Sequence, residues 1–154
     1  MTVIVDPVTF GVQFLSEDPS PLQYWNEVLR GLIAADAIGP TRSSRAFALL
    51  NTGFYDLWAA TDSAAAPVYG SAERFKTDVP LSSQLDGFAH QLLEEWFPDA
   101  ELPYLTPLPA DLQHHLSLLV ASIPLLDPWA EAPVPELAGG RDIALWNPEH
   151  VPID

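Results

Sequence analysis

Apolar side chains recur at steps of three and four residues in four separate stretches of the chain, the spacing of an amphipathic helix. The first stretch follows Ser20-Pro21, a helix cap and a first-turn proline, and ends at Gly39-Pro40. The second covers about residues 43–61, the third about 82–97, and the fourth about 110–123. We therefore predict an all-α domain, a bundle of about four helices.

The second stretch is apolar around most of its circumference. From Ala46 to Ala60 its only formal charge is Asp56. A helix that is apolar nearly all round is buried nearly all round, so we expect the helix at about 43–61 to be central. The predicted core comprises Trp25, Leu29, Leu32, Leu49, Leu50, Phe54, Leu57, Trp58, Phe88, Leu92, Trp96, Leu116 and Leu119.

Two segments without helical periodicity flank the helical domain, which we assign to residues 20–123. Residues 1–19 mix β-branched and aromatic side chains and are expected to form an extended arm. Residues 124–154 contain six of the 16 prolines, a density that forbids a helix over most of the segment. The segment also carries large apolar side chains, among them Leu125, Leu126, Trp129 and Trp146. We expect these side chains to dock the segment either on the chain's own helices or on a partner.

The composition argues against several classes of binding partner and of chemistry. Six Lys and Arg residues stand against 21 Asp and Glu residues, for a formal charge of −15, which disfavours binding to nucleic acids and to anionic lipids. The absence of cysteine excludes thiol chemistry and cysteine–zinc sites. We find no apolar run long enough to span a membrane and no signal-peptide pattern, and we expect a cytoplasmic protein that needs no cofactor.

Few residue patterns point to chemistry. His90 and Glu94 stand four apart and His114-His115 are adjacent, but no further ligands accompany them, so we predict no metal site. Asp56, beside Tyr55, is a carboxylate on the most apolar helix and must be paired or hydrogen-bonded. We expect a structural anchor, bonded to a loop backbone or an arginine, with a general-base role as the alternative.

Arg42 and Arg45 stand at the head of the same predicted helix. They are the expected partners for acidic groups elsewhere. If a second chain completed an anion-binding site, Arg42, Arg45, Tyr55 and Asp56 would lie near that composite site. No residue is predicted to be catalytic in the isolated chain.

One family resemblance runs through the first two predicted helices. It rests on Tyr24-Trp25-Asn26-Glu27-Val28, Gly39-Pro40-Thr41-Arg42, Ser44-Arg45-Ala46-Phe47-Ala48 and Phe54-Tyr55-Asp56-Leu57-Trp58-Ala59-Ala60. Over about residues 20–62 this pattern resembles the first helices of bacterial vanadium-dependent haloperoxidase-like proteins, which are relatives of the type-2 phosphatidic acid phosphatases. There, a tryptophan-bearing helix leads through a Gly-Pro turn to a helix with Ala-Arg-Ala and Tyr-Asp-Ala patterns.

The anion-binding motifs of that family do not occur in this sequence. In the family, phosphate or vanadate is held by a lysine, two arginines and a glycine amide, with histidines for covalent or acid–base work. This chain has no Arg-Pro and no Pro-Ser-Gly-His, and its only lysine, Lys76, precedes Thr77, Asp78 and Val79. The resemblance therefore implies the helical scaffold of the family without its catalytic half.

Three functions follow as hypotheses. The first is a non-catalytic helical subunit, or a truncated haloperoxidase-like scaffold, that acts through another protein chain or through self-association. The second is part of a composite haloperoxidase- or phosphatase-like enzyme whose anion site comes from a partner chain. The third is a small-molecule binding module in which Trp25, Trp58, Trp96 and Phe54 line a cavity between helices.

Overall fold

The computed structural model describes residues 18–70, 75–124 and 126, and within them it contains four helices and no strand. The helices are α2 (Pro21–Ala35), α3 (Pro40–Ala59), α4 (Leu81–Trp96) and α5 (Ala110–Ser122). This confirms the all-α prediction. The predicted arm at 1–19 and docking segment at 124–154 fall almost wholly outside the described residues.

Local sequence explains where α2 begins and ends. Ser20 and Gln23 form a capping box, in which each side chain bonds the other's backbone N–H. At the other end Ala37 adopts a left-handed conformation (φ 51°), and the Ile38 N–H donates to the Ile33 carbonyl at 3.0 Å. This is a Schellman motif, which turns the chain sharply after the helix although alanine stands where glycine is usual.

The Gly39-Pro40 pair starts α3; it does not end α2. Pro40 occupies the first helical position, where its missing N–H and preset φ angle cost nothing. The prediction that this dipeptide ends the first helix was therefore wrong by four residues, because the Schellman turn at Ala37 had already ended it.

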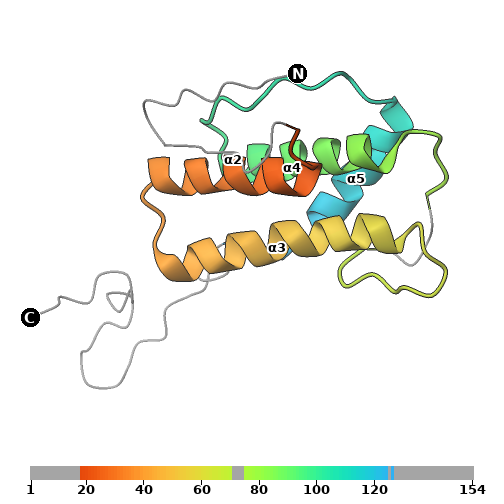
Figure 1. Cartoon of the computed structure of the whole chain (residues 1–154), viewed down its shortest axis with the longest axis horizontal. Helices are drawn as coiled ribbons and strands as arrows, with labels where there is room; N and C mark the ends of the chain where they lie inside the picture. The colour runs from red at the N-terminus through yellow and green to blue at the C-terminus, as the bar shows by residue number, and fades with distance from the viewer. Residues whose placement is uncertain (1–17, 71–74, 125, 127–154) are drawn as a thin grey trace, which may run out of the picture.

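The helices are arranged around α4. Helices α2 and α3 run antiparallel, with α4 behind α2 and α5 crossing at a steep angle (Figure 1). Helix α4 packs extensively against each of the other three, whereas α3 packs extensively against α2 and α4. The expectation that the helix at about 43–61 is central is thus corrected: α4 holds that position, and α3 leaves one face exposed.

Small residues let the helices approach closely. A Cβ atom added to Gly53 of α3 would collide with the ring of Phe88 on α4. A Cβ atom added to Gly87 of α4 would likewise collide with Leu108 and lie 2.9 Å from Leu116 of α5. Bulky side chains from neighbouring elements thus fill the space above each glycine.

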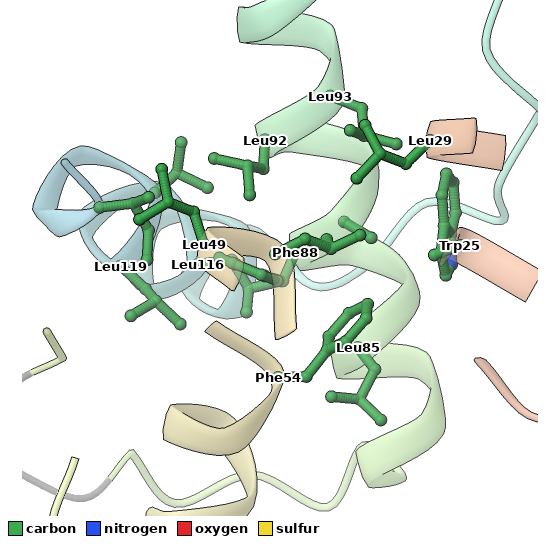
Figure 2. Packing of buried hydrophobic residues seen from close by; sticks show 14 of the residues in the cluster. Trp25, Leu29, Leu49, Phe54, Leu85, Phe88, Leu92, Leu93, Leu116 and Leu119 are labelled. Atoms are coloured by element: carbon green, nitrogen blue, oxygen red, sulfur yellow. The ribbon is translucent and has the colours of Figure 1, made fainter. Parts of the chain in front are cut away.

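The core lies where the four helices meet. Phe88 lies near its centre, with its ring centroid 5.9 Å from that of Phe54 in an edge-to-face arrangement (Figure 2). Ten of the predicted core residues are buried, and Leu32 and Trp96 are partly buried against the same cluster. Trp58 is the exception: it is 45% exposed, so its placement in the core was wrong.

Two polar contacts tie the helices together at defined positions. The buried Trp25 of α2 donates its indole N–H to Asp86 of α4 at 2.8 Å. Asn26 of α2 and Asn51 of α3 exchange amide hydrogen bonds of 3.1 and 2.8 Å. Such contacts satisfy part-buried polar groups and specify one register between neighbouring helices.

Candidate functional site

Asp56 fixes the loop that follows α3. Its side chain is only 3% exposed, and its carboxylate accepts backbone N–H bonds from Val68 (2.6 Å), Tyr69 (2.8 Å) and Gly70 (2.7 Å). Of the two partners expected for this carboxylate, the loop backbone is the one observed. Charge-assisted bonds to three amides occupy both oxygens and make Asp56 an anchor for residues 68–70.

Tyr55 and Trp58 form an exposed aromatic pair on the outer face of α3. Their ring centroids lie 5.7 Å apart, and the side chains are 40% and 45% exposed. The Tyr55 hydroxyl donates to the Ala66 carbonyl at 3.2 Å, and Val68, 59% exposed, follows in the same loop. We call Tyr55, Trp58 and Val68 the aromatic surface.

The four residues considered for a composite anion site do not converge. Arg42 lines a small cleft of about 210 Å³ with Glu95 and Trp96, at the opposite end of α3 from Asp56. Fourteen residues separate Arg42 from Asp56, which is about 21 Å along a helix axis. Arg45 is half-buried near the start of α3. The arginines and the Tyr55-Asp56 pair therefore belong to different parts of the molecule.

The predicted docking residues are divided between described and undescribed parts of the chain. Leu126 is 8% exposed and belongs to the hydrophobic core, so it packs on the chain's own helices, one of the two docking sites expected for this segment. Leu125, Trp129 and Trp146 lie outside the described residues.

The aromatic residues proposed to line a ligand cavity are not neighbours of one cavity. Trp25 and Phe54 are buried in the core, and Trp58 faces outward. Trp96 lines the small cleft beside Arg42. These four aromatics therefore do not line one ligand cavity.

A larger cleft was not foreseen from the sequence. Its volume is about 460 Å³, and four segments meet there: the end of α3, the loop before α4, the first turn of α4 and the middle of α5. Its lining is apolar at Leu57, Ala60 and Phe75, and polar at Thr61, Lys76, Thr77, Asp78, Gln84 and His115. The clustering of Lys76 with Thr77 and Asp78 was the available signal.

His115 takes part in this cleft as a stacked ring. It lies 4.5 Å from Phe75 between ring centroids, with an interplanar angle of 17°. Burial, and then the neighbouring His114, lower the pKa of His115 below its ordinary value. This shift favours the neutral imidazole, whose nitrogens offer hydrogen bonds instead of a charge.

His90 and Glu94 approach to 4.0 Å, but no group of three metal-ligating side chains occurs among the described residues. In the same part of the chain, none of the helices combines the length and apolar character required to cross a bilayer.

Comparisons with models of known families, with curated proteins and with solved structures found no match to this chain.

Proposed function

We propose that this chain is a non-catalytic helical module that acts by binding another protein chain through its aromatic surface. The observation that carries the proposal is the exposed pair Tyr55–Trp58 on α3, with a further exposed apolar side chain, Val68, in the loop that follows. Tyrosine and tryptophan are enriched among the residues that dominate binding energy at protein interfaces, because they offer large contact areas with few rotatable bonds. Single exposed apolar residues are normal on a protein surface, whereas two exposed aromatic rings side by side form a larger apolar patch.

The surroundings of the aromatic surface support this role because they hold it in place. The Asp56 carboxylate accepts hydrogen bonds from the backbone N–H groups of residues 68–70 and so fixes this part of the loop, and the Tyr55 hydroxyl donates to the Ala66 carbonyl. A surface that is already ordered loses less conformational entropy when a partner binds.

Charge favours a different chain over a second copy as the partner. Each copy carries a formal charge of −15, so two copies repel one another at long range. A partner with Lys or Arg around an apolar centre would instead be attracted and steered to the surface. Self-association remains the competing outcome of the experiment.

The family resemblance fits the same proposal. The segment that resembles haloperoxidase-like proteins, about 20–62, forms α2, α3 and the turn between them. We propose that the chain keeps a scaffold of this type and uses it for association. The composite enzyme receives no support from the geometry, because its four residues lie apart and the oxygens of Asp56 are already bonded.

The test compares Trp58→Ser with the matched variant Tyr104→Ser, since Tyr104 is also exposed, at 75%, but lies in the loop before α5. The partner is captured from the native host on the full chain, identified, purified and titrated by calorimetry. We expect Trp58→Ser to weaken Kd by about tenfold or more and Tyr104→Ser to leave it unchanged. Equal affinities for both variants would refute the proposal.

Light scattering during size-exclusion chromatography supplies the second arm. A monomer that captures one specific chain is the expected result. A dimer that Trp58→Ser dissociates would assign the aromatic surface to self-association. A monomer for which no partner is retained would overturn the proposal.

A further inference from the structure

The larger cleft brings opposite charges to one small cavity. Lys76 and Asp78 both line it, two residues apart in the loop that leads into α4. Among the described residues neither has an ion-pair partner, so both charges are available to a ligand. The volume of about 460 Å³ lies in the range of small-molecule sites.

We propose that this cleft binds a small zwitterion with an apolar side chain, such as a neutral α-amino acid. The ammonium of Lys76 pairs with the ligand's carboxylate, and the carboxylate of Asp78 pairs with the ligand's ammonium. A ligand with only one charge would satisfy one side chain and be repelled by the other, so the pair selects a molecule that carries both charges.

The rest of the lining suits such a ligand. Leu57 and Phe75 provide apolar surface, and the Phe75 ring is held by its stacking on His115. The Gln84 amide nitrogen donates to the Val79 carbonyl at 2.8 Å, which leaves its oxygen as an acceptor. The cleft is thus built from an apolar wall and polar groups that come from separate elements, the usual composition of a small-molecule site.

This site is separate from the aromatic surface. Leu57 and Ala60 line the cleft, whereas Tyr55 and Trp58 lie on the exposed face of α3. The proposal therefore stands or fails independently of the proposed partner binding.

The test uses L-leucine as the probe, followed through the backbone amide shifts of the isotope-labelled full chain at pH 7.5. Two analogues each lack one charge: 4-methylpentanoate has no ammonium, and 3-methylbutylamine has no carboxylate. We expect saturable leucine shifts at residues of the cleft and binding of either analogue to be about tenfold weaker or worse.

Three variants complete the test. Lys76→Met and Asp78→Asn replace exposed side chains and are each expected to weaken leucine binding about tenfold. Asp99→Asn, an exposed site in the loop after α4, is expected to leave it unchanged. The absence of saturable shifts up to about 50 mM overturns the proposal, since such binding is too weak to be specific. The proposal is also overturned if both cleft variants bind leucine as strongly as the unchanged protein does. It is likewise overturned if 4-methylpentanoate binds as strongly as leucine.

Discussion

Gly53 shows how one missing side chain sets the distance between two helices. The ring of Phe88 occupies the place that a Cβ atom would need, and both residues are buried. We predict that Gly53→Ala destabilises the protein by about 1–3 kcal/mol, because an overpacked core must shift backbone or rotamers. Urea unfolding followed by tryptophan fluorescence measures the difference.

Gly31 provides the matched control for this prediction. It also lies inside a helix, but a Cβ atom added there meets nothing within 4 Å. Alanine is the better helix former, so Gly31→Ala should stabilise the chain by roughly 0.5–1 kcal/mol. If both substitutions changed stability in the same direction, the steric explanation for Gly53 would be wrong.

Asp56 combines burial, charge and three hydrogen bonds in one side chain. Asp56→Asn keeps the shape but turns an NH₂ group toward backbone donors, so at least one N–H loses its acceptor. We predict a loss of about 3 kcal/mol. Hydrogen exchange at the amides of Val68, Tyr69 and Gly70 should accelerate more than exchange in α4.

Asp99→Asn is the control for the Asp56 variant. Asp99 is exposed, and its substitution should change stability by less than about 0.5 kcal/mol. A comparable loss in the two variants would mean that the anchored loop does not explain the effect.

The Asn26–Asn51 pair makes a prediction about two elements, α2 and α3. Their amides bond reciprocally, and each also donates to a carbonyl one turn earlier in its own helix. In a double-mutant cycle with alanine, we expect the two losses to be non-additive by about 1 kcal/mol. Asn26→Ala combined with Ser117→Ala, an exposed site on α5, should instead be additive. Additivity in both cycles would show that the amide pair contributes nothing.

At the scale of elements, helical periodicity predicted the four helices and most of the core. It failed on α3, because apolar residues around a helix show how much surface can be buried but not which neighbours will cover it. Trp58 has the same hydrophobic character as buried Trp25, yet it lies on the exposed face of α3. The exposed face of α3 carries the two rings of the aromatic surface.

The sites were less predictable than the fold for a related reason. The hydrogen bonds of Asp56 reach residues 12 to 14 positions away in an irregular loop, where no periodicity specifies the geometry. The cleft around Lys76 and Asp78 unites four segments, including His115, far apart in the sequence. Such sites depend on the relative placement of elements, which local patterns do not encode.

At the scale of the whole molecule, the net negative charge opposes folding. With a formal charge of −15, repulsion between acidic groups disfavours the compact state. One unfavourable placement is at the end of α4, where Glu94 and Glu95 lie in the last turn, which contains no basic residue. Carboxylates there also face the negative end of the helix dipole, which is unfavourable.

This arrangement predicts that salt stabilises the protein. Screening shortens the Debye length from about 30 Å at 0.01 M to about 8 Å at 0.15 M salt, which weakens the repulsion between exposed acids. The thermal midpoint should therefore rise steeply between these concentrations in NaCl or KCl alike. Glu94→Gln, which removes one of these carboxylates, should add about 0.3–1 kcal/mol of stability at low salt.

Differential scanning calorimetry of the unchanged chain and of Glu94→Gln across the salt series separates charge screening from general salting-out. If screening is responsible, the advantage of Glu94→Gln shrinks as salt rises and is nearly gone at 0.15 M or somewhat above. Salting-out would raise both midpoints in parallel and keep the difference constant. A midpoint that fell with added salt would mean that attractive ion pairs outweigh the repulsion, and that the excess of acids is balanced locally after all.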